Sequence, residues 1–336
     1  MSKCFNILSI DGGGIKGLYS AVILEKIEEE YGPIYQHFDL ICGTSTGGII
    51  ALALASGVPA RDVVGFYRDR GPLIFPYHQN WHRKLHFFKS ILLSTKYKDD
   101  ALKTELEKVF GNTRIEDCKA NVLIPSVNIT TGKPYVFKSD HNPTLTRDNK
   151  RLLTEVALAT AAAPTYFPIV ELETEKGREQ FVDGGLWANN PSLAGIQEFV
   201  KFYKDGSSYH DYCLLSISAL HERTRFPDPQ KVNRRKSFYK WGDRLISLMI
   251  DSQSEAVHNQ IEYLRSYIGG SYVRIPSMEL SESEKRYITL DGACPKSLRI
   301  MLEKGIQAAD QWIGKEELKT FFNNENREDT RNVKLS

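Results

Sequence analysis

The hydrophobic residues fall into short apolar runs that alternate with longer segments of helical periodicity. Within the first 220 residues the runs predict buried strands at 4–10, 38–42, 121–128, 134–138 and 212–218. The apolar spacing between them predicts a helix ending near 57 and further helices at 18–30, 59–68, 101–110, 152–162 and 192–203. A polar segment at 171–180 predicts a hairpin. Strands that alternate with helices in this way form a mostly parallel sheet covered on both faces, so we predict an α/β fold.

Beyond residue 220 the pattern becomes helical. One long helical pattern ends near Tyr267 and another covers roughly 296–313, whereas the tail after Asn323 is polar, as is typical of disordered segments. We therefore divide the chain into a core at 4–220, a helical extension at 221–323 packed on the same domain, and a disordered tail at 324–336.

Charge and apolar content narrow the classes of function. The 336 residues include 44 basic and 42 acidic side chains, for a net charge of +2. This balance argues against general binding of DNA or RNA, which requires a strongly basic domain. No apolar run approaches the length of a membrane span and no signal peptide is evident, so we expect contact with lipid to be peripheral.

The cysteines predict free thiols. The five are scattered, odd in number and never spaced as a metal-binding pair: Cys4, Cys42, Cys118, Cys213 and Cys294. This usage is typical of a reducing compartment and argues against both a disulfide framework and a zinc site. We accordingly expect a cytoplasmic protein.

A serine lies at the corner between a predicted strand and a predicted helix. The segment Gly43-Thr44-Ser45-Thr46-Gly47 follows the run at 38–42 and precedes the helix that ends near 57. A serine at such a corner is held in a strained turn with its hydroxyl exposed at a helix N-terminus, which suits a nucleophile. Gly43 and Gly47 are expected because side chains there would collide with the neighbouring strand and helix.

A glycine-rich loop follows the first strand. Gly12-Gly13-Gly14-Ile15-Lys16-Gly17 matches the spacing of a dinucleotide-binding loop. Asp11 would repel a pyrophosphate unless it is paired, and the acidic residues at 28–30 end a helix and not a strand. Without the serine corner, a tight turn would explain the loop. Beside that corner, its backbone N–H groups predict an oxyanion hole, with Lys16 steadying the loop or adding positive potential.

The nucleophile needs a general base. Three histidines in the second half of the chain lie in polar or helical stretches and are more simply surface residues: His210, His221 and His258. Three others recur every four residues but lack a carboxylate at metal-ligand spacing, which argues against a metal site: His78, His82 and His86. Asp183 ends an apolar run and precedes Gly184-Gly185, so it should protrude at a strand end. An Asp-Gly hairpin turn would explain the same residues. Partial burial beside an apolar substrate would raise the pKa of this carboxyl toward the range that a base requires.

These motifs, in this order, resemble the patatin-like phospholipases. The glycine loop from Asp11 to Gly17, the serine corner, Asp183-Gly184-Gly185 and the alanine-rich segment at 159–167 carry the resemblance, which covers about residues 4–195. It implies a three-layer patatin-like fold and a Ser–Asp dyad without histidine. The site residues it implies are Ser45 and Asp183 as the dyad, Gly12, Gly13 and Gly14 at the oxyanion hole, and Lys16, Gly17, Gly43, Gly47, Gly184 and Gly185 in support.

The resemblance also implies a reaction and its partners. The expected substrate is a membrane phospholipid, cleaved through an acyl-enzyme without metal or cofactor at the inner face of the membrane. Bacterial members of this appearance include antiphage effectors that a cyclic nucleotide switches on, so we consider such an activator. Lys16 stands where many members have arginine. A non-catalytic lipid- or nucleotide-binding module is the alternative, and homo-oligomerisation is left open.

Two basic segments have more than one interpretation. Residues 71–98 interleave aromatic and basic side chains, which suits either an anionic bilayer surface or an inserted segment packed on the core. Residues 223–244 are basic and suit a solvated helix face, a membrane contact or a pocket for an anionic effector.

Overall fold

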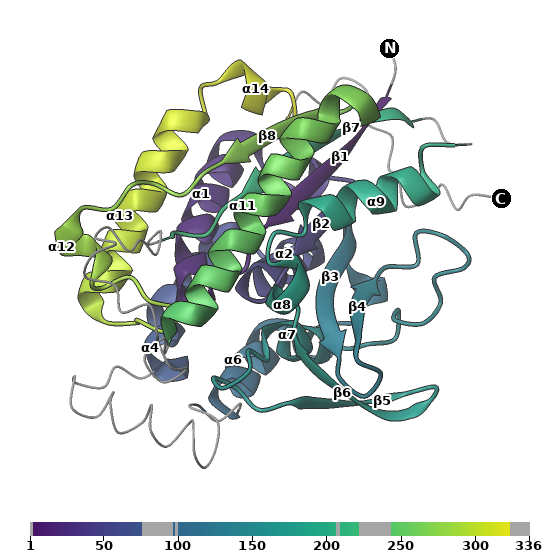
Figure 1. Cartoon of the computed structure of the whole chain (residues 1–336), viewed down its shortest axis with the longest axis horizontal. Helices are drawn as coiled ribbons and strands as arrows, with labels where there is room; N and C mark the ends of the chain where they lie inside the picture. Colours follow the sequence, from purple (N-terminus) through teal and green to yellow (C-terminus); the bar gives the residue numbers. More distant parts are fainter. Residues whose placement is uncertain (1–2, 76–96, 98–99, 206–208, 222–242, 323–336) are drawn as a thin grey trace, which may run out of the picture.

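The computed structural model describes residues 3–75, 97, 100–205, 209–221 and 243–322. Its strands form one sheet in the order β5-β6-β3-β2-β1-β7-β8, with β4 also paired to β3 (Figure 1). The strand bounds are β1 Lys3–Ile10, β2 Leu40–Gly43, β3 Asn121–Asn128, β4 Lys133–Lys138, β5 Val170–Thr174, β6 Gly177–Asp183, β7 Tyr209–Ile217 and β8 Ser271–Ile275. The central strands are parallel, and the antiparallel pairings lie at the β3–β6 end. The predicted α/β fold is confirmed.

Helices cover both faces of the sheet and make three layers. One apolar core includes residues of α1, α2, α3, α6, α7 and α13, and the other includes residues of α9 and α11, which cross the front of the sheet in Figure 1. The helix bounds are α1 Gly17–Tyr31, α2 Thr46–Ser56, α3 Ala60–Gly65, α4 Gly71–Ile74, α6 Asp100–Phe110, α7 Leu153–Ala161, α8 Gly185–Ala188, α9 Ser192–Phe202, α11 Asp243–Ile268, α12 Glu282–Lys285, α13 Pro295–Trp312 and α14 Glu316–Lys319.

The strand pattern explains this layering. On β1, Phe5 and Ile7 face the α9–α11 core while Leu8 and Ile10 face the other core, as the period of two along a strand requires. Because both faces are covered, the strand reads as a nearly continuous apolar run.

The segment after residue 220 differs from the prediction in one respect. The expected helices are present as α11 and α13, but β8 lies between them and pairs in parallel with β7. The extension is therefore not purely helical, because it supplies an edge strand to the core sheet. The prediction of a disordered tail at 324–336 lies outside the described residues.

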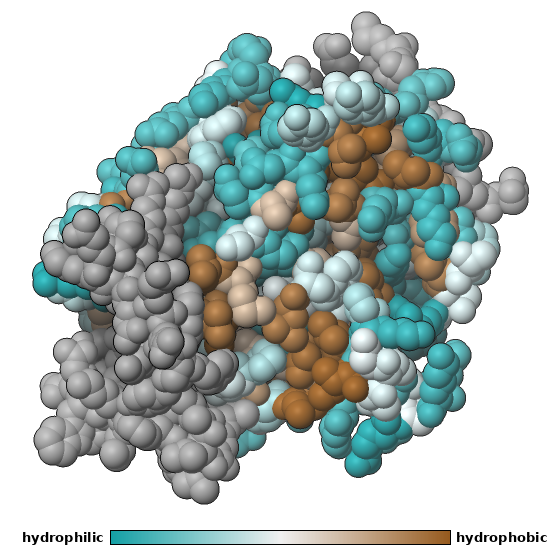
Figure 2. Space-filling view, viewed as in Figure 1, coloured by the Kyte–Doolittle hydropathy of each residue, from teal (hydrophilic) through white to brown (hydrophobic). Residues whose placement is uncertain are grey.

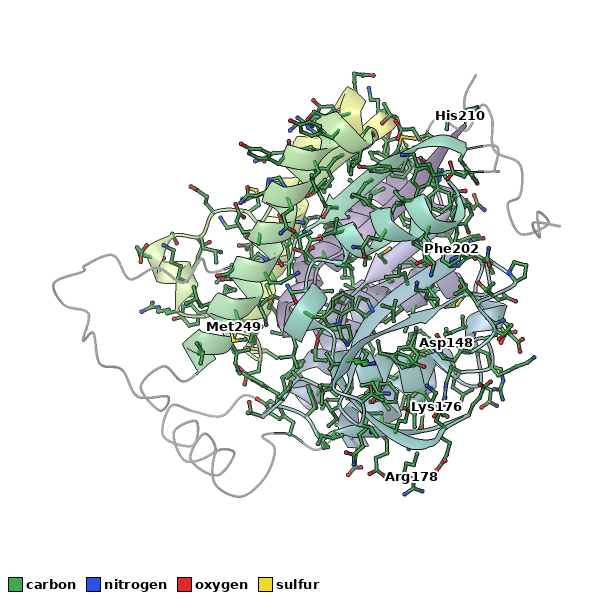
Figure 3. The ribbon with its side chains drawn as sticks, turned by 45° about the vertical axis from the view of Figure 1, so that its right-hand side comes forward. Asp148, Lys176, Arg178, Phe202, His210 and Met249 are labelled. Atoms are coloured by element: carbon green, nitrogen blue, oxygen red, sulfur yellow. A yellow bond between two sulfur atoms is a disulfide. The ribbon has the colours of Figure 1, made fainter. Side chains whose placement is uncertain are left out.

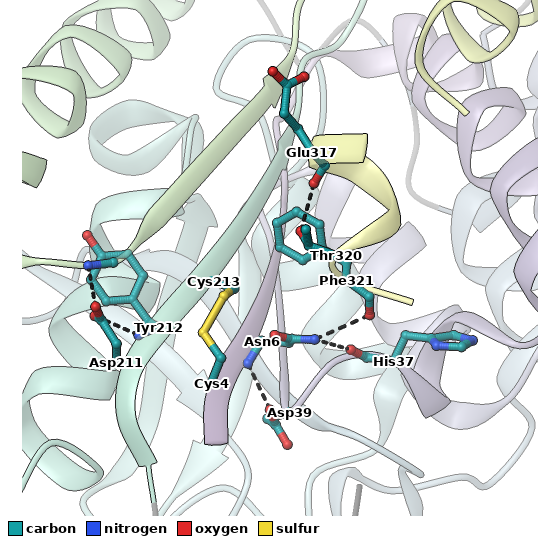
Figure 4. Close-up of a disulfide and its surroundings, with 11 residues drawn as sticks. Cys4, Asn6, His37, Asp39, Asp211, Tyr212, Cys213, Glu317, Thr320 and Phe321 are labelled. Carbon is teal, nitrogen blue, oxygen red and sulfur yellow. Dashed lines mark hydrogen bonds between the residues drawn. A yellow bond between two sulfur atoms is a disulfide. The ribbon is translucent and has the colours of Figure 1, made fainter. Parts of the chain in front are cut away.

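The expectation that all five cysteines are free is wrong for two of them. Cys4 on β1 and Cys213 on β7 form a disulfide, with Cα atoms 6.0 Å apart (Figure 4). The strands are parallel neighbours whose register sets Cys4 opposite Asp211 and Asn6 opposite Cys213, so the two cysteines are diagonal partners. Their separation of 209 residues hides this pairing in the sequence. The cysteine pattern therefore no longer supports a reducing compartment.

Aromatic residues at the two described ends of the basic segment at 71–98 pack on the core. Phe75 and Tyr97 are buried, and each ring contacts Phe167, with centroids 5.7 and 5.8 Å away. The Tyr97 hydroxyl also donates to Asp291 at 2.8 Å. Residues 76–96, which carry most of the proposed membrane contact, and nearly all of 223–244 lie outside the described residues. No helix in the described ranges is long and apolar enough to cross a membrane.

Candidate active site

Ser45 lies at a sharp turn between β2 and α2. Its backbone has φ 55° and ψ −125°, in the left-handed half of the map that a residue with a side chain rarely adopts. A side chain at Gly43 would collide with the carbonyl of Gly47, and one at Gly47 with the carbonyl of Ile10. The helix and strand thus approach too closely for any residue but glycine, as predicted.

Asp183 reaches Ser45 because two strands meet end to end along β3. The parallel β2 pairs with β3 up to Leu123, and the antiparallel β6 ends with Asp183 opposite Ser126. β4 occupies the other edge of β3, so β2 and β6 run toward each other on the same edge. Pro125, which has no N–H to donate, lies in the gap between them. The Ser45 hydroxyl donates to Asp183 Oδ2 at 2.7 Å.

Further hydrogen bonds hold the two groups in place. The Ser45 amide donates to Thr160 Oγ1 at 3.0 Å, and that hydroxyl donates to the carbonyl of Pro125 at 2.6 Å. The Gly185 amide donates to Asp183 Oδ1 at 2.7 Å, and a side chain at Gly184 would collide with Pro125. Gly184 and Gly185 thus allow the chain to fold back over β3 at the carboxylate.

Burial changes the chemistry of Asp183. Its removal from water raises the pKa to about 6, against the opposing effect of the hydrogen bonds from Gly185 and Ser45. A carboxylate with this pKa is a stronger base than an exposed aspartate and is still ionised at neutral pH. The predicted rise in pKa is therefore present even without a bound substrate.

The glycine loop after β1 lies against the serine turn. A Cβ atom at Gly12 would be 3.2 Å from that of Ser45, and Gly13 and Gly14 line the same pocket as Ser45 and Asp183. The Gly12 amide, however, donates to the backbone carbonyl of Asn189 at 2.9 Å. Gly12 is therefore removed from the expected set of oxyanion donors, which leaves Gly13 and Gly14.

Lys16 and Gly17 form the base of this loop. Lys16 lies in the 3-10 turn Gly14–Lys16 and is only 3% exposed. Gly17 begins α1, and a side chain at this position would collide with Thr46 at the start of α2. Both residues therefore fit a supporting role in which the loop is packed against the serine helix.

Two residues that brace the loop were missed in the sequence. Arg274 on β8 binds the buried Asp11 through both terminal nitrogens, at 2.6 and 3.3 Å. The side-chain amide of Asn189 donates to the carbonyl of Gly12 at 3.2 Å and to Ser254 Oγ on α11 at 2.8 Å. The Asn189-Asn190-Pro191 segment after Asp183 was the one available signal for the second brace.

The pairing of Asp11 changes the expectation that this residue would repel a dinucleotide. Because Arg274 neutralises Asp11, repulsion of a pyrophosphate no longer excludes that ligand. The contact with Leu290 still disfavours a dinucleotide, because the Ile15 amide donates to the Leu290 carbonyl at 2.9 Å and Gly14 packs directly against the same carbonyl. The Ile15 N–H of the turn that should cradle phosphates is thus already bonded within the chain, whereas Gly13 and Gly14 line the pocket.

The dyad opens into an apolar pocket of about 270 Å³. Its apolar walls include Phe66, Tyr67, Ile74, Phe75, Leu102, Tyr166, Phe167, Leu245, Ile246, Ile250 and Leu290. No histidine lines this pocket within the described residues. His221 and His258 instead border a second cavity behind α11, so the structure gives neither the role of base.

Exposed apolar side chains line this pocket or lie close in sequence to residues that line it. Leu186 on α8 and Met249 on α11 line it while remaining 49% and 52% exposed. Leu73 and Ile169, 56% and 49% exposed, lie one and two residues from lining residues. Figure 2 shows apolar surface at the lower end of α11 and beneath α8, and Figure 3 places Met249 at that end of α11.

Comparisons with known proteins give one family model and several similar proteins. A model of the patatin-like phospholipase family matches residues 8–195. A cGAMP-activated phospholipase from Pseudomonas aeruginosa is 34% identical over 311 residues, covering 92% of this chain and 89% of its own. A protein of the same description from Vibrio cholerae is 33% identical, with 94% of each chain covered. The solved human GIVD cytosolic phospholipase A2 aligns with a TM-score of 0.46 and 9% identity, over 95% of this chain and 60% of its own.

Proposed function

Because the chain belongs to the patatin-like phospholipase family, we propose that it hydrolyses acyl ester bonds of membrane phospholipids through a Ser45–Asp183 dyad. The observation that carries this proposal is the 2.7 Å hydrogen bond between these side chains at the base of an apolar pocket. The pocket suits an acyl chain, because its walls are apolar and the polar groups gather at the dyad and the glycine loop.

Acylation begins with proton transfer. Asp183 Oδ2 accepts the proton of Ser45 as Oγ attacks the ester carbonyl carbon, and the N–H groups of Gly13 and Gly14 donate to the oxyanion. As the tetrahedral intermediate collapses, the alkoxide of the leaving lysophospholipid takes the proton from Asp183. Ser45 then carries the acyl group as an ester.

Deacylation repeats these steps with water. Asp183 accepts a proton from the water that attacks the acyl-enzyme, and the same N–H groups stabilise the second oxyanion. Ser45 Oγ leaves with the proton that Asp183 holds, which releases a fatty acid and restores the dyad. A single carboxylate serves both half-reactions because it alternates between base and acid.

The proposed site of action is the inner face of the membrane, with the protein in the cytoplasm between encounters. Leu73, Ile169, Leu186 and Met249 would enter the interfacial region and place the mouth of the pocket on the lipid surface. A phospholipid could then move its acyl chain into the pocket without crossing water. The exposed apolar rim supports this arrangement.

We further propose that a cyclic nucleotide activates the enzyme in antiviral defence. Relatives with this activator in their names align over nearly their whole length and nearly all of this chain. The alignment thus includes the region beyond residue 220, which lies outside the family-model match.

Mass spectrometry of lipid products tests the catalytic proposal. Vesicles of bacterial phospholipids incubated with the native protein and cGAMP should yield lysophospholipid and fatty acid, and S45A and D183N should yield neither above background. S56A is the matched control for the serine, because Ser56 lies at the other end of α2 and its hydroxyl donates to the Ala53 carbonyl at 2.8 Å. Product formation by S45A at the native rate would refute the dyad.

A further inference from the structure

A second cavity, of about 560 Å³, lies behind α11 at the carboxyl ends of β7 and β8. Its polar lining includes His221, Asp251, Glu255, His258 and Arg274, with Trp312 at its border. Ligands of open α/β sheets bind outside the carboxyl ends of the strands, and this volume lies within the range of ligand pockets. The cavity is thus separate from the apolar pocket of the dyad and differs from it in chemistry.

Buried donors face this cavity. His221 is 10% exposed at its side chain, and its Nδ1 lies 2.8 Å from Asp251 Oδ1. Its Nε2 is buried and has no hydrogen-bond partner among the described residues. Arg274, also 10% exposed, uses three of its five N–H groups on Asp11 and Ser216 within the described chain. Buried polar groups are normally hydrogen-bonded, so an unpartnered nitrogen here indicates a position for a ligand acceptor.

The lining combines groups that recognise different parts of a nucleotide. Arg274 and the imidazoles of His221 and His258 can donate to phosphate oxygens, whereas Asp251 and Glu255 can accept from ribose hydroxyls or the amino groups of a base. The two carboxylates disfavour inorganic phosphate alone. Trp312 offers an aromatic surface for a base. We propose that this cavity is the binding site for the cyclic dinucleotide activator, an inference that rests on the proposed nucleotide activation.

Helix α11 lines both the dyad pocket and the polar cavity. Leu245, Ile246, Met249 and Ile250 of α11 line the dyad pocket, and Leu248, Asp251, Ser252 and Glu255 line the polar cavity. These two sets lie on different faces of one helix, so a ligand that moves or orders α11 changes the wall of the active site. Arg274 adds a second connection, because it binds Asp11 directly before the glycine loop.

Calorimetric titration with cGAMP tests the site. The variants E255Q and H258Q should each weaken binding at least tenfold, because each removes a group that lines the cavity. E262Q is the matched control: Glu262 is on the same helix, pairs with Arg265 at 3.1 Å and does not line the cavity, so its affinity should be native. S45A should also bind with native affinity, since the dyad pocket is a separate cavity.

A variant that blocks the cavity sterically separates loss of the binding site from loss of the fold. Ser252 is exposed at the edge of the cavity, so S252W can fill it from the surface and should abolish binding while Tm stays within a few degrees of native. Native affinity in E255Q, H258Q and S252W would overturn this site and leave nucleotide activation standing. Absence of binding to the native protein would overturn both, whereas hydrolysis of phospholipid by the dyad is judged separately from its lipid products.

Discussion

Arg274 and Asp11, 263 residues apart in the chain, form a two-point ion pair directly beneath the glycine loop. Asp11 is fully buried and Arg274 nearly so, and the Ser216 hydroxyl accepts a further hydrogen bond from the guanidinium at 2.6 Å. The pair connects the edge strand β8 to the turn that precedes the oxyanion donors. The C-terminal region therefore contributes structurally to the active site, because it supplies Arg274.

Loss of this pair should destabilise the protein and weaken catalysis. R274M leaves the Asp11 carboxylate buried without its partner, so we expect about 3–5 kcal/mol of lost unfolding free energy. R274K keeps the charge but loses the two-point geometry and should fall between R274M and native. Urea unfolding measures the free energy of unfolding of both variants. R286K, a surface change on the same segment, is the control, and native stability in R274M would contradict the assigned role.

Backbone strain at Ser45 predicts a difference between two inactive variants. S45A keeps a side chain at φ 55°, whereas S45G relieves the strain because glycine adopts this conformation freely. S45G should therefore be about 1–2 kcal/mol more stable than S45A, although both lack the nucleophile. Thermal unfolding compares the stabilities of S45G and S45A. Equal stability would mean that the turn is not strained.

The raised pKa of Asp183 predicts a pH dependence of the reaction. Because the base must be ionised, kcat/KM should rise with pH and level off above an apparent pKa near 6. Rates with an uncharged short-chain ester, measured from pH 4.5 to 8.5, test this without titration of the substrate. A profile that is flat down to pH 4.5 would exclude Asp183 as the base.

The same shift predicts that the functional carboxylate lowers stability. The pKa of Asp183 is raised from 3.8 to about 6 in the folded state, so the favourable effect of its protonated form is complete below pH 4 and is lost as pH rises to 6. Above pH 6 the buried charge costs about 3 kcal/mol. D183N should therefore be more stable than native at pH 8 and no more stable at pH 4. Denaturant unfolding tests this, with D310N on α13 as the exposed control.

The apolar rim predicts a loss specific to membranes. L186D and M249D each place a charge where the pocket mouth would meet lipid, so we expect binding to anionic vesicles to fall about tenfold or more. L264D is the control, since Leu264 is 41% exposed on α11 but does not line the pocket. Vesicle co-sedimentation measures the effect, and an unchanged affinity in both rim variants would place the membrane contact elsewhere.

The sequence by itself determined the elements and the turn at the nucleophile. Local periodicity and turn chemistry predicted most strands and helices within a few residues, including the strand–Ser45–helix corner and the end of β6 at Asp183. The glycines at 43 and 47 followed from the same local reasoning. β8 was missed because its five residues include the polar Ser271 and the charged Arg274 and follow two glycines, which is too weak a pattern to predict a strand.

Only the tertiary structure decided which groups meet. The approach of Ser45 and Asp183 depends on β2 and β6 ending on the same edge of β3, and the Cys4–Cys213 disulfide depends on the register of β1 against β7. The removal of Gly12 as an oxyanion donor and the Asp11–Arg274 pair likewise depend on long-range contacts. Local propensities contain no information on such contacts, because strand order and register are set by packing across the whole sheet.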